Sequence, residues 1–598
     1  MGQTHGLRLR PRALRRLTRP VASPRDQRIP PRPRALRVAL SPARSVMAIY
    51  GIDLGTTFSS VAYVARGVSQ VIPLELGRPT LASLCLFTTP HGAPTALVGT
   101  PALDAYRTLV GDAAEPPPGV VLVRGAKNHI GVREATYAGP PWRVADHDLY
   151  ATDVSAVFLR TLAEMVRGAP GLPPLDGVVV THPQRFRNRE KLATAQAARL
   201  AGLPLLGMLT EPDAAAWAYG LHGNTDKPGQ TFMVFDFGGG TLDVTLMRRE
   251  PSARGAAQVR AIDSYGVQLG GLSLDRTIRD ALVAQYAAAT GDPAFSLATV
   301  SEATAERLLE LAEWFKITLN TDAGADSNPL ARERRKRFTP VFDAEAEGEE
   351  VTLRLTLGDL GRILSGEIDR AVGCADEALA RARLRWDQLD EVLLTGGSSL
   401  LWPLQQRLRE RCGAVRVFDD PAHPLNPLTI VASGAALYGA SLAEGGAGRV
   451  GVEVRGVVPD TFGIQYFVPD PRGPDGRRAE MYPLVPAGTP TPFVGRASFT
   501  MRGGGQVLPV EVFEGRTLAE ATRVGVYQVD FGREVPDGST VEVTLDVQGG
   551  GVLVLGVRDA RSGVMREARL DDAPGLYSDA EMASRAAWLQ ALRVDWRG

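Results

Sequence analysis

Two short stretches constrain this 598-residue chain more than any other feature of its sequence. They read YGIDLGTTFSS, beginning at Tyr50, and VFDFGGGTLDVTL, beginning at Val234. Each is an apolar strand that ends in aspartate, then small residues and threonine, then a second strand. Small residues let backbone N–H groups approach phosphate oxygens, and an aspartate at the strand end can hold Mg²⁺ through its waters. Two such hairpins, about 180 residues apart, predict a duplicated fold with a nucleotide between its halves.

A glycine-rich hairpin on its own is a weak signal, because glycine also marks ordinary turns. Two further Gly-Gly turns occur in the same part of the chain, in VQLGGLSLD from Val267 and in LLTGGSS from Leu393. The four turns together favour phosphate binding over a set of unrelated turns.

The chain separates into parts with different hydrophobic patterns. In residues 47–443, short apolar strands such as 177–183 alternate with amphipathic helices such as 188–202 and 304–320, which is typical of an α/β domain. In residues 457–570 the helical period disappears and alternating strands predict an antiparallel β-domain.

The remaining segments connect or extend these two parts. Residues 444–456 are glycine-rich at their start and predict an interdomain linker. Residues 571–598 predict a short helical tail, with Ser578 placed to cap the helix and Glu581 three residues on. Residues 1–46 hold twelve arginines, seven prolines and one acidic residue, so we expect a disordered extension or a start upstream of the natural one. A basic tail for an acidic partner and a transit peptide are the alternatives for this segment.

Composition excludes several functional classes. The formal net charge is zero, which argues against nucleic acid or an anionic membrane as the main partner. Cys85, Cys374 and Cys412 lie far apart without a nearby histidine pair, which argues against a disulfide framework or a zinc site. No apolar run approaches the ~18 residues that cross a bilayer. We therefore expect a soluble, cytoplasmic protein.

Several motifs in a fixed order resemble one family. GIDLGTTFS, GAKNHIG, VVVTHPQRF, LTEPDAAAWAYGL, FDFGGGTLDVT, LGGLSLD, LLTGGSSLLWPL and NPLTIVASGAALYGA together resemble the ATPase domain of the heat-shock protein 70 (DnaK-type) family. The resemblance runs from Met47 to Ala440 and continues more weakly to about Leu570. It implies an actin-like, two-lobed ATPase domain of duplicated ribonuclease-H-like fold, followed by an antiparallel β-sandwich.

The resemblance also implies the residues of an ATPase site that uses ATP/ADP, Mg²⁺ and K⁺. Lys127, one of only five lysines among 67 basic residues, would orient the attacking water. The other catalytic positions are Asp53, Asp236, Thr241 and Glu211, and the cation ligands are Asp53, Asp236 and Asp243. Nucleotide contacts are expected from Gly55, Thr56, Thr57, Gly238, Gly239, Gly240, Gly271, Glu313, Lys316, Asn320, Gly396, Gly397 and Ser398. Pro183 and Glu211 match an interlobe relay.

In the β-domain, the family lines its cleft for extended apolar peptides at positions that match Ile464, Phe467, Phe499, Leu508 and Val510. Ordinary sandwich core is the alternative interpretation of these five residues. The chain departs from the family elsewhere. Ile317 and Leu400 stand where two arginines usually sandwich the purine, and Leu272 replaces an acidic residue. The linker lacks the usual leucines followed by aspartate, and the tail is too short for the usual helical lid.

Two functional hypotheses follow. The first is an ATP-dependent chaperone that binds unfolded polypeptide segments, with J-domain and nucleotide-exchange co-chaperones as further partners and a truncated lid. The second is a nucleotide-switched scaffold or regulator that binds one specific protein without general chaperone activity. A third hypothesis, a small-molecule kinase of the same superfamily, does not account for the C-terminal β-domain or for the sequence around Lys127.

Overall fold

The computed structural model describes residues 47–597 apart from several short gaps. These gaps are 112, 114, 133–141, 223–228, 251–256, 322–327, 341–347, 419–425, 444–451, 473–475, 549–552 and 571–575. The chain divides into two units, Met1–Val46 and Met47–Gly598, and everything below concerns the second unit. The expected disordered extension, and residues 444–451 of the expected linker, lie outside the described residues.

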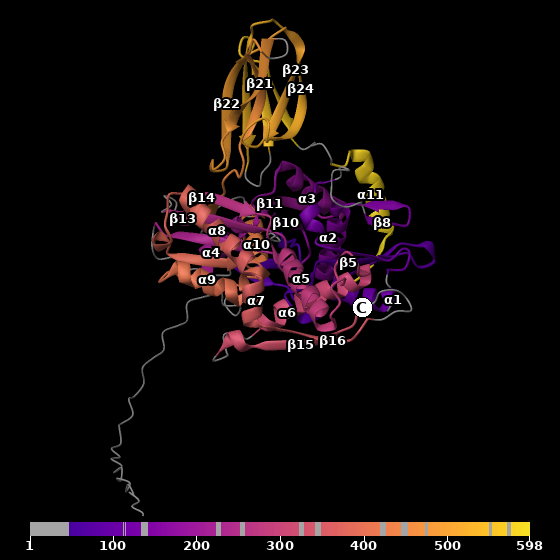
Figure 1. Cartoon of the computed structure of the whole chain (residues 1–598). Coiled ribbons are helices and arrows are strands. Elements are labelled where there is room, and N and C mark those ends of the chain that lie inside the picture. The colour runs from indigo at the N-terminus through magenta and orange to yellow at the C-terminus, as the bar shows by residue number, and fades with distance from the viewer. Residues whose placement is uncertain are drawn as a thin grey trace, which may run out of the picture. The chain divides into compact units, whose positions relative to one another are not determined.

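Two six-stranded sheets form the α/β part, and their strands pair in the same pattern. Strands β10 and β11 of the first sheet and β13 and β14 of the second are labelled in Figure 1. The first sheet has the order β11 (Leu205–Thr210), β10 (Gly177–His182), β1 (Ile49–Asp53), β2 (Phe58–Ala65) and β3 (Val68–Val71), with β4 (Thr80–Ala82) also on β2. The second has the order β18 (Arg416–Phe418), β17 (Glu391–Thr395), β12 (Thr231–Phe237), β13 (Leu242–Glu250), β14 (Ala257–Val267) and β19 (Val452–Arg455). In each sheet a central hairpin, β1–β2 or β12–β13, pairs in parallel with the strand on its other side. The two glycine-rich motifs are the turns of these two hairpins.

Helices cover the sheets and supply their cores, which confirms the predicted α/β fold. Helices α2 (Ala151–Gly168) and α3 (Asn188–Leu200) share a core with the first sheet. Helices α5 (Gly271–Thr290), α6 (Glu302–Asn320), α7 (Leu357–Ile363), α8 (Ser365–Arg381) and α9 (Trp402–Cys412) share one with the second sheet. The helices expected at 188–202 and 304–320 are α3 and α6.

Two further helices, α4 (Glu211–His222) and α10 (Ile430–Ala443), have a core that draws residues from both sheets. A side chain on Gly434 of α10 would lie 1.7 Å from the carbonyl oxygen of Ala214 in α4. A side chain on Gly51 of β1 would lie 2.2 Å from the backbone nitrogen of Ala436. Backbone therefore meets backbone where these elements cross, and only glycine fits.

Smaller elements extend the α/β part. Strands β5 (Leu84–Thr88), β6 (Thr95–Val98) and β7 (Val121–Arg124) form an antiparallel sheet that packs with α1 (Thr100–Val110). Strands β15 (Glu333–Phe338) and β16 (Val351–Thr356) form a separate hairpin.

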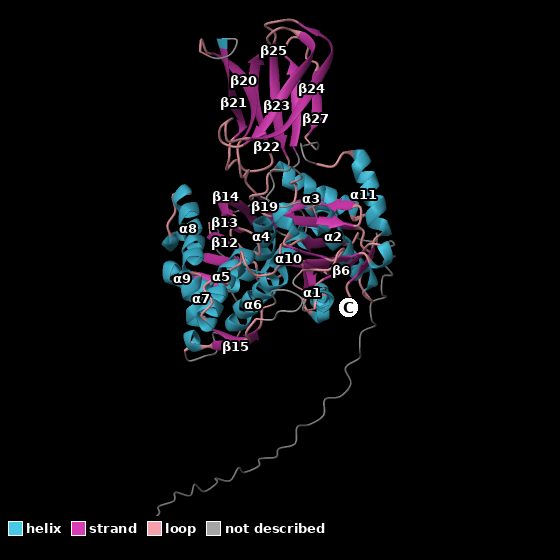
Figure 2. Ribbon diagram, turned by 45° about the vertical axis from the view of Figure 1, so that its right-hand side comes forward, coloured by secondary structure: helices cyan, strands magenta, loops and turns pink. Residues whose placement is uncertain are grey.

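Apart from the gaps at 473–475 and 549–552, residues 457–570 form mainly strands with connecting loops, as the alternating pattern predicts (Figure 2). One antiparallel sheet has the order β21 (Arg477–Val485), β20 (Phe462–Pro469), β23 (Gly505–Glu514) and β24 (Thr522–Val535). The other has the order β22 (Phe493–Thr500), β25 (Thr540–Val547), β26 (Leu553–Asp559) and β27 (Met565–Arg569). A single apolar core draws on both sheets. We call this part of the chain the strand segment.

The linker expected at 444–456 is in part regular structure. Residues 452–455 form β19, which pairs in parallel with β14 from Ala257↔Val452 to Arg260↔Arg455. Glycine-rich composition at 444–448 led to the expectation, but the alternation of valine with charged residues in VEVR suits an edge strand.

The C-terminal tail contains the expected helix, α11 (Asp579–Ala591), with the capping box of Ser578 and Glu581. Instead of forming a shortened lid on the strand segment, the tail binds the α/β part. The Tyr577 hydroxyl donates to Asp153 Oδ2 of α2 at 2.7 Å, and the Gln196 side chain of α3 bonds both the N–H and the C=O of Tyr577. After the helix, β28 (Arg593–Asp595) pairs in parallel with β6. Sequence periodicity predicts the helix but does not indicate which surface of the protein the helix will contact.

The crossing of α4 and α10 yields a stability prediction. Gly434→Ala should lower the free energy of unfolding by about 2 kcal/mol or more, because the new methyl group displaces backbone of α4 in a close-packed core. The matched control is Gly373→Ala in α8, where the added carbon meets no atom within 4 Å. Chemical denaturation should show Gly373→Ala unchanged or stabilised by up to about 1 kcal/mol. Equal effects of the two changes would contradict the close packing.

Candidate nucleotide-binding site

The predicted site residues gather around one cavity of about 830 Å³. The predicted residues that line it are Asp53, Gly55, Thr56, Thr57, Lys127, Glu211, Asp236, Gly238, Gly239, Thr241, Gly271, Glu313, Lys316, Asn320, Gly396, Gly397 and Ser398. Three predicted residues do not line the cavity: Gly240 and Asp243, which are close to lining residues in the chain, and Pro183, which follows β10. The volume falls within the range of small-molecule sites.

The first loop connects β1 to β2. A side chain on Gly55 would lie 1.8 Å from the carbonyl oxygen of Phe58, so the turn can close only with glycine there. The backbone N–H of Gly55 donates to Ser59 Oγ at 3.1 Å, and the Thr56 hydroxyl donates to Asn128 Oδ1 at 3.3 Å. These bonds fix the loop at the edge of the cavity.

The second loop connects β12 to β13 and is held by the start of α5. The N–H of Gly271 donates to the carbonyl oxygen of Gly238 at 3.0 Å, and the N–H of Leu272 donates to that of Gly239 at 2.9 Å. A side chain on Gly270 would lie 2.4 Å from the nitrogen of Gly240. The glycines are therefore required for loop packing as well as for the approach of a phosphate group.

The two loops also face each other directly. A side chain on Gly239 would lie 1.9 Å from Thr57 Oγ1, and one on Gly240 would lie 1.8 Å from Asn128 Oδ1. This contact joins the hairpin turns of the two sheets, as expected for a ligand held between equivalent loops.

Buried carboxylates lie beside the loops. Asp236 of β12 and Asp243 of β13 are directly opposite each other in the hairpin register. Like charges in such a pair destabilise a sheet. The Thr395 hydroxyl donates to Asp236 Oδ1 at 2.7 Å, whereas Asp236 Oδ2 is buried without a hydrogen bond from the described residues. Burial, and next the charge of Glu211, raise the pKa of Asp236 well above its usual range and that of Asp243 to about 7.

Asp53 completes this group from the end of β1. Its Oδ1 accepts a hydrogen bond from the Thr181 hydroxyl at 3.1 Å, and burial together with Glu211 raises the pKa of Asp53 to about 7. An arrangement of this kind fits a cation, which would relieve the repulsion. Among the described residues, no three acidic, histidine or cysteine side chains come close enough to hold a metal ion by themselves. A Mg²⁺ ion that keeps several waters and binds phosphate oxygens suits this geometry.

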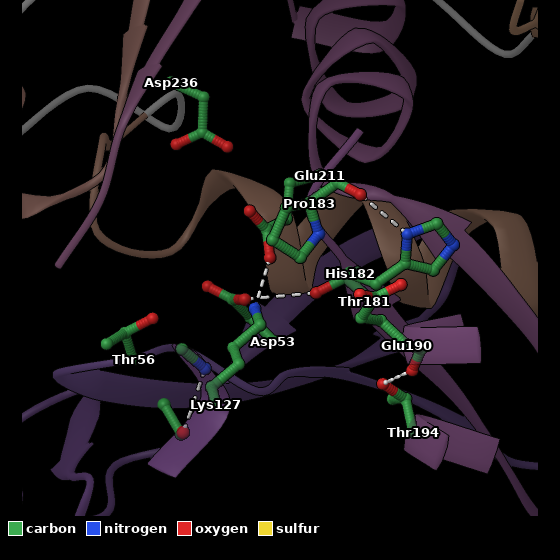
Figure 3. Close-up of polar contacts among 12 residues, drawn as sticks. Asp53, Thr56, Lys127, Thr181, His182, Pro183, Glu190, Thr194, Glu211 and Asp236 are labelled. Carbon is green, nitrogen blue, oxygen red and sulfur yellow. Dashed lines mark hydrogen bonds and ion pairs between the residues drawn. The ribbon is translucent and has the colours of Figure 1, made fainter. Parts of the chain in front are cut away.

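Lys127 lies in a turn of 3₁₀ helix, Ala126–His129, directly after β7. Its ammonium group forms an ion pair with Glu211 at the start of α4, and both side chains are buried (Figure 3). The ammonium nitrogen is also 5.9 Å from the centre of the Phe186 ring. Lys127 is therefore a positioned charge at the cavity and not a surface lysine.

The two residues expected to form a relay are close in space. His182 and Thr210 are paired in the parallel strands β10 and β11, and Pro183 and Glu211 follow them directly in the chain. Glu211 lines the cavity, while Pro183 begins the segment that leads into α3.

At the other end of the cavity, the residues expected to hold ribose and adenine bond to other protein groups. Lys316 forms an ion pair with Asp275 at 2.7 Å, and Glu313 lies 3.7 Å from Arg124. The Asn320 amide donates to the carbonyl oxygen of Lys316 and accepts from the Trp402 backbone N–H. Ile317 is 47% exposed and lines the cavity together with Leu400.

One wall of this end of the cavity was not predicted from the sequence. Trp402, Gln405, Gln406 and Arg409 of α9 line the cavity, as does Arg78. The four α9 residues are spaced i, i+3, i+4 and i+7, which places them on one face of the helix. That spacing is a visible signal, but it equally describes an ordinary amphipathic helix.

The five residues expected to line a peptide cleft have different surroundings. Ile464 and Val510 are buried in the core of the strand segment, and Phe499 and Leu508 pack against that core. Phe467 is 54% exposed, with the Arg477 guanidinium 4.8 Å from its ring centre. Phe499 lies with Tyr466 and Tyr482 in an aromatic cluster, with ring centres 5.3–6.2 Å apart.

The family model described as Hsp70 protein matches residues 127–587. Because the match covers more than half of the chain, this protein belongs to the Hsp70 family. Members of this family are chaperone-type ATPases that bind ATP and ADP. No helix within the described ranges is long and apolar enough to cross a membrane.

The end of the cavity where the base is expected gives a prediction about affinity. Ile317→Arg should tighten ATP binding about two- to fivefold, because a guanidinium above an aromatic ring contributes about 0.5–1 kcal/mol at a partly exposed site. Leu330→Arg, which adds the same charge at another exposed position, is the control and should leave affinity unchanged. Isothermal titration with ATP measures both. An equal gain in the two variants would reveal a general charge effect and no stacking on the base.

Proposed function

We propose that this protein is an ATP-dependent chaperone, which hydrolyses ATP to ADP and phosphate to control its binding of extended apolar segments of unfolded proteins. One observation carries the proposal. The buried Lys127 ammonium, the carboxylates of Asp53 and Asp236 and two glycine loops meet around a single cavity of nucleotide size.

The residues have distinct roles in this proposal. Backbone amides of 55–57 and 238–240 and the start of α5 would hold the phosphates, with Thr241 and Ser398 beside them. Asp53, Asp236 and Asp243 would bind Mg²⁺ through water, or K⁺. Bound Mg²⁺ supplies charge neutralisation at the phosphates. Lys127, fixed by Glu211, would orient the water that attacks the γ-phosphate, since phosphoryl transfer needs positioned charge more than a strong base.

The domain boundaries are part of the same proposal. Residues 47–443 would be a two-lobed, actin-like ATPase domain, and the repeated strand order of its two sheets supports this. Residues 457–570 would be a peptide-binding β-sandwich, supported by two antiparallel sheets on one core. The aromatic cluster of Tyr466, Tyr482 and Phe499 offers apolar surface for a peptide. J-domain and nucleotide-exchange proteins would be co-chaperones.

Two observations favour a second candidate, a nucleotide-switched scaffold that binds one specific partner. Ile464 and Val510, two of the expected cleft residues, are buried in the core. The base end of the cavity also has aliphatic Ile317 and Leu400 where the family usually has arginines. A scaffold would bind nucleotide without a response to unfolded peptides.

The test is ATP turnover with and without an unfolded apolar peptide. Lys127→Met should lower turnover by about 100-fold or more with nucleotide binding retained, because one positioned charge is lost at the reacting phosphate. Lys336→Met on β15 is the control, since Lys336 is exposed and should be dispensable. Thermal unfolding with and without ADP checks that each variant binds nucleotide.

Removal of Lys127 alone leaves Glu211 buried without its partner, which destabilises a protein strongly. The double variant Lys127→Met with Glu211→Gln removes both charges and separates loss of folding from loss of catalysis. Turnover unaffected by either variant would refute the catalytic assignment. Nucleotide binding without any peptide response in the unmodified chain would support the scaffold.

A further inference from the structure

The end of the cavity where the base is expected is formed by helices α6 and α9, which are joined directly and are both labelled in Figure 1. The Asn320 side chain, at the end of α6, accepts a hydrogen bond at 2.7 Å from the backbone N–H of Trp402, the first residue of α9. Ile317 lies three residues before Asn320, and Leu400 lies two residues before Trp402. The two residues expected on the faces of the base are therefore both connected to the start of α9.

Core packing decides which side of α9 is turned towards the cavity. Leu404, Leu408 and Cys412 recur at every fourth position and are buried in the core of the second sheet. Gln405 lies one residue after Leu404, which is about 100° around the helix. It lines the cavity one turn into α9, and Gln406 lines it as well. The buried leucines therefore hold both glutamine side chains at the wall of the cavity.

These two glutamines have amides available to a ligand, unlike the residues expected to hold ribose and adenine. Lys316 is paired with Asp275, and the Asn320 amide donates to one backbone group and accepts from another. In the part of the chain that the structure describes, neither the Gln405 nor the Gln406 side chain forms a hydrogen bond with another protein group. Each free amide offers a ligand both a donor and an acceptor.

The residues expected on the faces of the base cannot select one base over another. Ile317 and Leu400 line the cavity and are aliphatic, so neither has a donor or an acceptor for a ring edge. Contact with the face of a base is tolerant of its identity, because every base has a π-face. Selection therefore requires polar groups that reach the edge of the ring. The amides of Gln405 and Gln406 are groups of this kind on the adjoining wall.

We propose that Gln405 and Gln406 determine the nucleotide specificity of the site by binding the edge of an adenine ring whose faces contact Ile317 and Leu400. The aliphatic side chains would hold the ring, and the amides of α9 would select it. Both glutamines would act on binding and not on the reacting phosphate. The inference rests on the function proposed above and deepens it by assigning the residues that choose adenine over other bases.

The chemistry of an amide favours adenine over guanine. Adenine presents the donor of its 6-amino group beside the acceptor N7, and the oxygen and NH₂ of a glutamine amide match this pair. Guanine presents two acceptors, O6 and N7, on the same edge, and these suit an arginine better than a glutamine. A site that bonds to a particular group of its ligand also rejects analogues that lack the group, because its own polar atoms are then left unpaired.

Nucleoside diphosphates that differ only in the base test the assignment without any need for hydrolysis. The probes are ADP, GDP and the diphosphates of purine riboside, which lacks the 6-amino group, and of 7-deazaadenosine, which lacks N7. Isothermal titration in the presence of Mg²⁺ gives the affinity of the full chain for each probe. Wild type should bind ADP about 5- to 100-fold more tightly than each of the other three, as expected for recognition of a base edge by amides.

Leucine variants remove each amide and keep most of the bulk of the side chain. Gln405→Leu and Gln406→Leu should each weaken ADP binding about two- to tenfold, because each loses its hydrogen bonds to the ring. Affinity for purine riboside diphosphate should change little, so the double variant should bind the two nucleotides almost equally. Glu410→Leu is the control, since Glu410 is on the same helix but does not line the cavity, and it should keep the wild-type ratio. Thermal unfolding without nucleotide checks that each variant is folded.

Several outcomes would overturn the proposal. One is a folded double variant that keeps the wild-type preference for ADP over purine riboside diphosphate, and another is an equal loss of affinity for all four probes. Tighter binding of GDP than of ADP by wild type would also overturn it and would assign base recognition to Arg409. Selective ADP binding that depends on the glutamines, in a chain without ATP turnover, would support the specificity assignment and refute only the ATPase activity. A wild-type chain that binds none of the probes would refute the proposed function and this inference together.

Discussion

The contact between two hairpin loops is the constraint on which the rest of the structure depends. Gly239 has no side chain because Thr57 lies where one would be, and Gly270 has none because the backbone of 239–240 passes there. These close approaches bring Asp53 and Asp236 to one cavity from separate sheets. The position of each loop is in turn set by the packing of its sheet on α4 and α10, where Gly434 and Ala214 meet backbone to backbone.

Several charged side chains of the protein are buried. The Lys127–Glu211 ion pair and Asp236 line the cavity, and Asp243 lies opposite Asp236 in the hairpin, so that a bound cation and phosphates would balance these charges. Glu514 of β23 is a further buried acid, and it caps the start of α3 by accepting a hydrogen bond from the Asn188 backbone N–H. Charged groups that are costly to bury therefore lie at the cavity and at the contact between β23 and α3.

Local patterns predicted much of the fold and the two glycine loops that line the cavity. Strand β10, helices α3 and α6, and the loops at Gly55 and Gly238 follow from periodicity and glycine placement. Long-range partners did not follow from such patterns. The pairing of β19 with β14, the cap from Glu514 and the attachment of α11 each join positions whose local sequence is compatible with other surroundings. Alternation also could not distinguish the core residues Ile464 and Val510 from the exposed Phe467. Strand periodicity shows which residues share one face of a strand, but not which other element packs against that face.

The strand segment is fastened to the α/β part on both sides of its sequence. Before it, β19 extends one sheet by pairing with β14, and after it, β28 extends another by pairing with β6. A domain connected at one flexible point can rotate in any direction, whereas a domain connected at two separated points can rotate only about the line that joins them. If both strands stay paired, the strand segment can therefore rotate only about a single hinge axis. A larger movement requires β19 or β28 to lose its pairing with the neighbouring strand.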